Sequence, residues 1–151
     1  MRAVLQRVLS ADVVVDESVV GSVKRGFVVF LGIGKNDSEK DLDYLVRKIC
    51  GLRIFEDENG KMNLDPKSAN AEMLVISNFT LYANTTHGFR PDFLESMPPK
   101  EAKEYVEMFI IKSKEQNCFK KIETGIFGAD MTVNCVNDGP VTIIFDTEKM
   151  I

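Results

Sequence analysis

Three side chains capable of hydrogen bonding follow a short apolar run in the middle of the chain. Residues 73–76, MLVI, have the composition of a buried strand, and they lead directly into Ser77, Asn78 and Thr80. Two hydroxyls and an amide at a strand end can bind a ligand and orient it. The same residue types also form polar turns that only cap a strand. The residues alone leave both interpretations open.

The segment NDGPVT, residues 137–142, is unusual because the runs on both sides of it have strand character. Gly139 has the least restricted backbone of any residue type, whereas Pro140 fixes its own φ and has no N–H for a sheet ladder. One interpretation is a turn or an edge bulge, where proline is tolerated. The other is a cis Gly–Pro peptide, as found in about 5–6% of X–Pro bonds, which would direct consecutive carbonyls the same way.

Several other kinds of site are disfavoured. The single histidine, His87, lies in a polar segment, so a histidine-centred triad or metal site would depend on it alone, and a solvated loop histidine is expected. Gly32 and Gly34 lack the third glycine of a dinucleotide fingerprint. We therefore expect neither a cofactor nor a metal.

The cysteines, Cys50, Cys118 and Cys135, are odd in number and lack a CxxC spacing. This pattern indicates neither a disulfide framework nor a cysteine metal site. We expect three reduced thiols in the core.

Length and composition indicate one globular domain spanning residues 1–151, because 44% hydrophobic residues suffice for a sizeable core. No run approaches the roughly 18 apolar residues of a membrane helix, and the N-terminal segment lacks a signal-peptide pattern, so we expect a cytoplasmic protein without membrane contact. The net charge of −4 argues against a broad surface that follows phosphates. We expect no DNA partner, and any RNA contact should be small and local.

The elements that must position the polar residues follow from periodicity. Residues 38–50 form an amphipathic helix with an acidic first turn, and Pro98–Pro99 opens a second helix. Strands are expected at residues 2–8, 11–15, 26–33, 52–55, 72–79, 119–123, 131–137 and 141–146, with a hairpin containing a short strand in residues 16–26. This order indicates an α+β fold in which a largely antiparallel sheet, or partly closed β-barrel, is covered by two main helices.

These segments together resemble one family. MRAVLQRV at the start, LRIFEDENGKMN, SNFTLYA followed by GFRPDF, TGIFGADM and NDGPVT match the D-aminoacyl-tRNA deacylases from end to end. These are editing enzymes that remove D-amino acids from mischarged tRNA. The family carries an SQFTL-type and an NxGPxT-type signature, and the order and separation of both fit. One departure is Asn78, whose amide is one methylene shorter than the family glutamine, so a contact that depends on glutamine's reach must shift or pass through water.

The resemblance implies hydrolysis of the ester between an amino acid and the acceptor end of tRNA. Positioning and oxyanion stabilisation could supply most of the acceleration for so labile a bond. The implied catalytic residues are Ser77, Asn78, Phe79 and Thr80. Thr80 matches the nucleophile candidate of the family, but a threonine without an adjacent base is a poor nucleophile. We therefore favour a substrate-assisted route, in which the neighbouring ribose hydroxyl positions or activates water.

The resemblance also implies a homodimer with cross-subunit active sites. Gly139 and Pro140, joined by a cis bond, would enter the site of the other subunit and act as a chirality filter. Their carbonyls would collide with an L side chain, so D-aminoacyl and glycyl esters would remain substrates. Arg7 and Asn137 are implied to support the filter, although Arg7 could instead be a surface charge on a strand.

The terminal adenosine of tRNA needs an apolar slot, because single-stranded ends are held by stacking and backbone hydrogen bonds. By resemblance, its candidate residues are Phe127, Gly128 and Met131, although the spacing of Phe127 also suits a core residue. Arg90 could contact a phosphate near that end or pair with Asp92 or Glu95.

Two other functions stay open. A protein of the same fold could hold adenosine-ended RNA without hydrolysing it, and the Asn78 departure is the only sequence feature in favour of this. A small-molecule esterase could instead use Thr80 as a covalent nucleophile.

Overall fold

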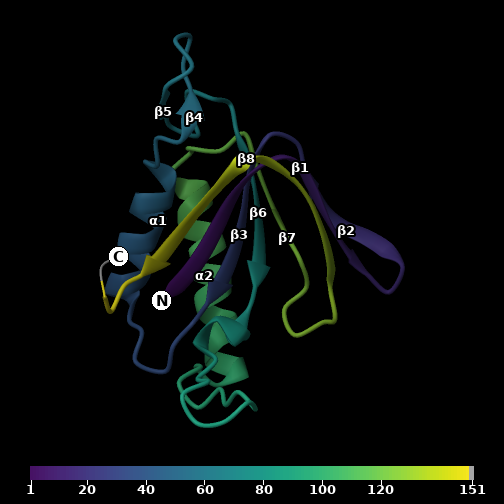
Figure 1. Cartoon of the computed structure of the whole chain (residues 1–151), viewed down its shortest axis with the longest axis vertical. Coiled ribbons are helices and arrows are strands. Elements are labelled where there is room, and N and C mark those ends of the chain that lie inside the picture. The colour runs from purple at the N-terminus through teal and green to yellow at the C-terminus, as the bar shows by residue number, and fades with distance from the viewer. Residues whose placement is uncertain (150–151) are drawn as a thin grey trace.

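The structure is a computed structural model, and it describes residues 1–149. Its helices are α1 (Glu39–Cys50), α2 (Pro99–Glu115) and the 3-10 helix η1 (Phe79–Tyr82). Its strands are β1 (Arg2–Val15), β2 (Ser18–Val23), β3 (Gly26–Gly32), β4 (Phe55–Glu56), β5 (Met62–Leu64), β6 (Glu72–Ser77), β7 (Lys121–Thr124) and β8 (Thr132–Asp146). Figure 1 shows the β4–β5 hairpin at one end of the molecule and the loop after η1 at the other.

The sheet is organised around β1. One edge of β1 pairs with β3 along residues 2–8 and with β2 along residues 11–15, and the other edge pairs with β8, all antiparallel. β3, β6 and β7 continue the sheet in parallel. β2 also lies close to β7, the last strand of this series. The closeness is evident at Gly21, where an added Cβ would lie 2.7 Å from the carbonyl oxygen of Thr124. The predicted α+β fold with a partly closed barrel is confirmed.

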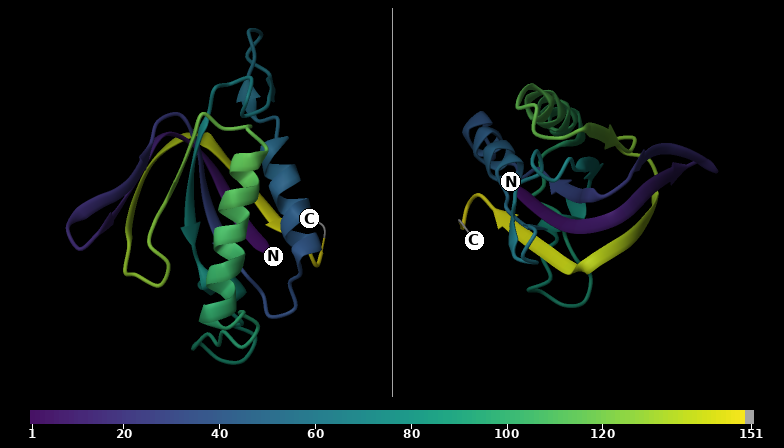
Figure 2. Two further views of the ribbon diagram at one scale, coloured as in Figure 1. Left: turned by 180° about the vertical axis from the view of Figure 1, so that it is seen from behind. Right: turned by 90° about the horizontal axis from the view of Figure 1, so that it is seen from above.

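The main core fills the space between the helices and the sheet. Figure 2 shows α1 and α2 side by side on one face, with β8 on the opposite side. Phe27, Phe55 and Phe109 are fully buried in this core. A second apolar cluster, which includes Val8 and Leu74, lies within the curved sheet. None of the helices in residues 1–149 combines the length and the apolar character needed to cross a membrane.

Both predicted α-helices are present for the expected reasons. α1 begins after Ser38, whose backbone N–H donates to the carboxylate of Asp41 at 3.0 Å. Its apolar face is buried, as the helical spacing predicts. α2 begins at Pro99, where the missing N–H of proline costs no helical hydrogen bond.

Several strand predictions differ from the structure. The strand expected at residues 72–79 ends at Ser77, and Phe79 begins η1. The two strands expected in residues 2–15 are one continuous β1, and the two expected in residues 131–146 are one continuous β8. Both continue because the β1–β8 ladder absorbs irregular residues as register shifts. The strand expected at residues 52–55 is only the short β4, which pairs with β5 in a hairpin.

The prediction of three reduced thiols is wrong for two of the cysteines. Cys50, the last residue of α1, forms a disulfide with Cys118, whose Cα lies 5.7 Å away. The two helices run in the same direction across the sheet, so their C-terminal ends meet (Figure 1). A separation of 68 residues gives no sign of this pairing in the sequence. Cys135 is free.

Candidate active site

The polar residues after β6 lie where the parallel pairing with β3 ends. The pairing reaches Leu31 and Ser77, and the N–H of Asn78 donates to the Leu31 carbonyl at 2.8 Å. The chain then turns into η1, where the hydroxyl of Thr80 donates to Oδ1 of Asn78 at 2.5 Å. Phe79 and Thr80 are exposed. The backbone N–H groups of these two residues have no acceptor within the short helix, because they belong to its first turn.

Two glycines make room for η1. A Cβ at Gly32 would lie 2.9 Å from the Asn78 carbonyl oxygen, and one at Gly34 would lie 2.6 Å from the hydroxyl oxygen of Tyr82. The hydroxyl of Tyr82, which is 2% exposed, donates to Oδ2 of Asp37 at 3.2 Å. The segment Gly32–Gly34 is therefore a strand end and turn, as expected. Its close packing against Asn78 and Tyr82 helps to position η1.

Burial, followed by the negative charge of Asp37, raises the pKa of Tyr82. The phenol is therefore neutral at physiological pH and holds η1 by donating its proton to Asp37. The same carboxylate also accepts the Gly34 N–H at 2.6 Å and pairs with the amino group of Met1.

A cavity of about 150 Å³ opens next to Ser77, between the β6–β7 edge and α2. It is lined by Val75, Ser77, Lys103, Val106, Glu107, Ile110, Thr124, Gly125 and Phe127. The fold thus brings Ser77 and Phe127 to one cavity, although they are 50 positions apart in the chain. The α2 residues could not be recognised from the sequence, because Lys103 and Glu107 have the spacing of an ordinary exposed i,i+4 pair.

The other two adenosine candidates, Gly128 and Met131, are not among the residues that line this cavity. Gly128 is exposed, has a φ of +76°, and follows Phe127 in the turn. Met131 packs with Val133 against the second apolar cluster, and its sulfur occupies the space that a Cβ at Gly125 would need. Gly125 itself lines the cavity, so Met131 supports the wall and does not face the opening.

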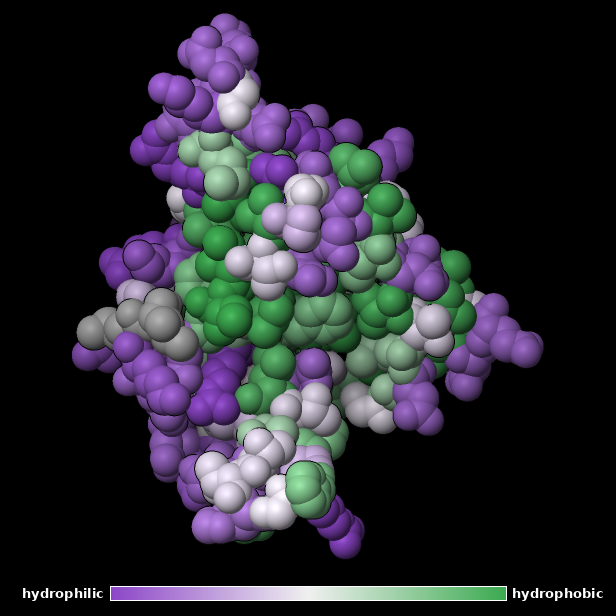
Figure 3. All heavy atoms as spheres, viewed as in Figure 1, coloured by the Kyte–Doolittle hydropathy of each residue, from purple (hydrophilic) through white to green (hydrophobic). Residues whose placement is uncertain are grey.

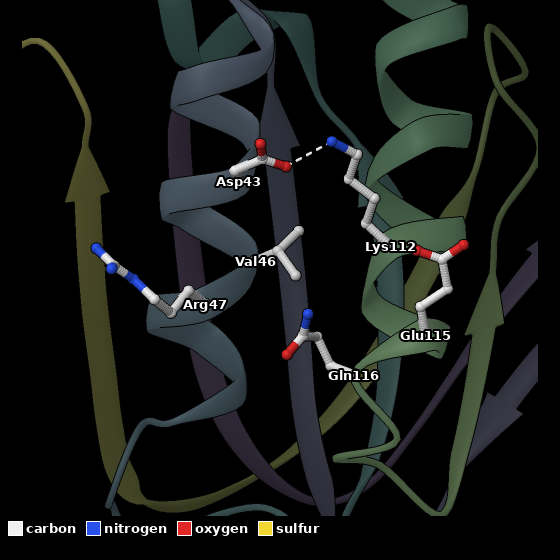
Figure 4. Close-up of a pocket in the computed structure, with 6 residues that line it drawn as sticks. All are labelled: Asp43, Val46, Arg47, Lys112, Glu115 and Gln116. Atoms are coloured by element: carbon white, nitrogen blue, oxygen red, sulfur yellow. Dashed lines mark hydrogen bonds and ion pairs between the residues drawn. The ribbon is translucent and has the colours of Figure 1, made fainter.

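A larger cavity of about 360 Å³ lies between α1 and α2 (Figure 4). Charged side chains dominate its lining, and Lys112 donates to Asp43 at 2.5 Å across it. This hydrogen bond raises the pKa of Lys112. None of the predicted site residues lines this cavity. Nowhere in residues 1–149 do three or more His, Cys, Asp or Glu side chains gather as a metal site would require.

Gly139 and Pro140 protrude from the sheet edge in a bulge. Gln6 and Val8 of β1 pair with Thr142 and Asn137 of β8. One residue, Arg7, lies between the first two, whereas the four residues 138–141 lie between their partners. The Gly139–Pro140 peptide bond is cis, and both residues are exposed. The segment therefore combines the two features that the sequence left open, an irregular bulge and a cis Gly–Pro peptide.

Arg7 lies beneath the bulge and is only 4% exposed, so it is not a surface charge. Its Nη1 donates to the Ile54 carbonyl at 2.6 Å, and its Nε lies 3.3 Å from the Asp138 carbonyl oxygen and 3.2 Å from Oδ2 of the same residue. Asn137, which pairs with Val8 at the start of the bulge, is exposed.

Within one chain, the bulge is remote from the polar residues Ser77, Asn78 and Thr80. Ser77 on β6 pairs with Leu31 on β3, which in turn pairs with Ala3 on β1. The bulge on β8 lies opposite Arg7, four residues further along β1. With about 3.3 Å per residue and 4.8 Å per strand, Gly139 and Ser77 are on the order of 20 Å apart. The two predicted parts of the site therefore do not meet within a single chain.

The loop after η1 contains two further residues of interest. His87 and Arg90 are both exposed there, and a solvated loop histidine agrees with the sequence prediction. The carboxylate of Glu95 pairs with Lys35 at 2.7 Å, and that of Asp92 accepts the Leu94 N–H at 3.2 Å. Among residues 1–149, Arg90 forms no ion pair.

Comparisons with known proteins show the family to which the chain belongs. Residues 4–146 match the family described as D-Tyr-tRNA(Tyr) deacylase. The D-aminoacyl-tRNA deacylases of Thermotoga petrophila and Aquifex aeolicus are 52% and 53% identical, over 99% of this chain and 99% and 100% of their own. The solved structure of the c-Myc DNA Unwinding Element Binding Protein superimposes with a TM-score of 0.92 at 39% identity, covering 97% of this chain and 98% of its own. A probable eukaryotic D-amino acid tRNA deacylase, 14% identical, shares the fold with a TM-score of 0.84 over 95% of this chain and 97% of its own. The chain belongs to the D-aminoacyl-tRNA deacylase family.

Proposed function

We propose that this protein hydrolyses the ester bond of D-aminoacyl-tRNA and releases the free D-amino acid and tRNA. The observation that carries the proposal is the joint placement of Ser77 and Phe127 at one cavity, in a member of this family whose Thr80 follows Ser77 by three residues. Hydroxyls and free N–H groups can orient an ester beside an aromatic wall that suits a nucleobase. The reaction needs no cofactor, because water supplies both the nucleophile and the proton.

Thr80 orients the ester and does not form a covalent intermediate. Its hydroxyl proton is directed at the amide oxygen of Asn78, which accepts a hydrogen bond but is too weak a base to take up a proton. The neighbouring ribose hydroxyl of the substrate positions the attacking water. The N–H groups of Phe79 and Thr80 stabilise the negative charge that develops on the carbonyl oxygen.

The terminal adenosine binds in the cavity beside Ser77. Phe127 provides an apolar ring for stacking, and Gly128 lets the backbone of the turn approach the base. Lys103, on the α2 side, provides a positive charge near the entrance. Met131 contributes indirectly, because it holds the cavity wall at Gly125.

The chirality filter comes from a second copy of the chain. The estimated 20 Å between Gly139 and Ser77 supports a homodimer in which each bulge enters the partner's site. Three apolar residues on β1 and β8 are exposed, as expected for a face that a second copy covers: Leu9, Val136 and Ile144. Figure 3 shows apolar surface across the centre of the side that carries β8. Backbone carbonyls at the bulge exclude an L side chain, so glycyl-tRNA is also cleaved. Arg7 holds the bulge, and Asn137 begins it.

The proposed role is chirality proofreading in the cytoplasm, where aminoacyl-tRNA is used. The likeness to a protein described as a DNA unwinding element binding protein suggests a second function, DNA binding. The net charge of −4 argues against it, because nonspecific DNA affinity arises from cationic side chains that neutralise phosphates.

The test uses D-tyrosyl-, L-tyrosyl- and glycyl-tRNA with the purified protein and no added metal. Release from the D and glycyl esters, with the L ester spared, is expected. Tight retention of tRNA without hydrolysis of any ester would favour an RNA-binding role instead. A duplex containing an unwinding element serves as the DNA control.

Two variants separate the parts of the mechanism. Thr80→Val should lower the rate without abolishing it, whereas complete loss, with an acyl-enzyme trapped in the parent protein, would establish covalent catalysis. Gly139→Ala should weaken D/L discrimination, because its Cβ would lie 2.9 Å from Cγ2 of Val141 at a φ of +127°. Gly60→Ala is the matched control, since Gly60 also has positive φ but lies in the β4–β5 hairpin.

A further inference from the structure

The loop that follows η1 forms a small closed lobe, residues 84–92. Asn84 and Asp92 exchange two backbone hydrogen bonds, of 2.9 and 3.1 Å, which fix its base. Its tip presents Phe89, which is 107% exposed and contributes nothing to the core. In Figure 1 the lobe is the teal loop at the end of the molecule where β6 terminates, and Figure 3 shows weakly polar and apolar surface there.

The base of the lobe is joined to the candidate active site. The ring of Phe93, the residue after the lobe, packs edge-on against the ring of Phe79, with centroids 5.0 Å apart. The hydroxyl of Ser96 donates to the Phe79 carbonyl at 3.1 Å. Asn84 is only four residues from Thr80. Phe89 at the tip is three residues from Asp92 at the base. An extended chain of this length lets the tip reach roughly 10 Å beyond the base of the lobe.

The lobe offers a positive charge next to its exposed ring. Arg90 is exposed and has no ion-pair partner within the described part of the chain, 1–149. The two nearby carboxylates are engaged elsewhere, since Asp92 accepts a backbone N–H and Glu95 pairs with Lys35. An exposed aromatic ring beside a free guanidinium is the combination that binds single-stranded nucleic acid, by stacking on a base and pairing with a phosphate.

We propose that Phe89 and Arg90 bind the single-stranded acceptor end of tRNA just upstream of the terminal adenosine. This inference rests on the proposed deacylase function. Phe89 stacks on a base, and Arg90 contacts an adjacent phosphate. The lobe adds affinity for the tRNA end and takes no part in ester cleavage.

The experiment compares two substrates, D-tyrosyl-tRNA and D-tyrosyl-adenosine, which lacks every upstream nucleotide. For Phe89→Ala we expect a roughly tenfold lower kcat/KM on the tRNA through KM, as the loss of one base stack predicts, with kcat unchanged. Activity on D-tyrosyl-adenosine should be unaffected. Phe89→Trp should restore the tRNA activity, because any aromatic ring can stack. Arg90→Ala should also weaken tRNA binding and reduce its salt dependence by about 0.7 in log–log slope.

Matched controls exclude a general surface effect. Ile111→Ala removes an exposed apolar residue from α2, and Lys61→Ala removes a charge from the distant β4–β5 hairpin. Neither should alter the ratio of the two activities. An unchanged ratio in Phe89→Ala and Arg90→Ala, whether both activities persist or both fall together, would overturn the proposal. A parent protein that cleaves neither substrate would refute the proposed function itself, and this result is distinct from an unchanged ratio.

Discussion

Arg7 offers the most direct test of how the fold holds the Gly139–Pro140 bulge. The guanidinium is buried beneath the bulge and donates to the carbonyl of Ile54 and toward both the carbonyl and the carboxylate of Asp138. Arg7→Met keeps the length and apolar character of the side chain but removes every donor. The carboxylate of Asp138 then loses its cation, and the Ile54 carbonyl loses its partner.

The expected loss in the free energy of unfolding is about 3 kcal/mol. Removal of one partner of a buried ion pair costs roughly 3–5 kcal/mol. Asp138 retains a 28% exposed side chain, so water can solvate part of its charge and the cost falls at the lower end. Asp138→Asn should cost less, because the buried guanidinium keeps both of its carbonyl partners.

The assay is urea unfolding of the parent, both single variants and the double variant, together with cleavage rates for D- and L-tyrosyl-tRNA. A coupling energy of about 1–3 kcal/mol is expected from the double-mutant cycle. Arg7→Met should also cleave the L ester faster relative to the D ester, because the bulge is no longer held. Arg7→Met with parental stability and parental D/L selectivity would refute this account of the bulge.

Three further predictions concern the support of the site. Gly34→Ala should cost about 1–3 kcal/mol and slow deacylation, because its Cβ would lie 2.6 Å from the hydroxyl oxygen of Tyr82; parental urea stability would contradict this. Burial, followed by the charge of Asp37, raises the pKa of Tyr82 above its ordinary 10.0, so the unfolded state should ionise first and the free energy of unfolding should fall above about pH 10, by up to about 1.4 kcal/mol per pH unit. Tyr82→Phe should flatten that slope, and equal slopes for parent and variant would be the opposite result. The disulfide between Cys50 and Cys118 closes a long loop, so its reduction should cost about 4 kcal/mol in the chain-entropy description; the double serine variant should then be insensitive to dithiothreitol, and an unchanged urea midpoint of the reduced parent would contradict the expectation.

Local patterns were sufficient for most of the fold. Helix α1 follows from an acidic first turn and apolar residues at helical spacing, and α2 follows from its opening prolines. The buried strands β3 and β6 are continuous apolar runs. These features depend on neighbours within a few residues, so the sequence carries them directly. Strand ends were less predictable, because the ladder between β1 and β8 continues through residues that would interrupt an isolated strand.

Residue type and short-range spacing are enough to predict the two amphipathic helices, the polar residues at the end of β6 and the unusual Gly139–Pro140 step. The folded structure is needed to show which distant residues meet. It joined Cys50 to Cys118, placed Phe127 beside Ser77, and buried Arg7 under the bulge. It also placed Gly139 on the far side of β1 from Ser77. These contacts result from strand order and helix packing, which bring together segments that have no local influence on each other.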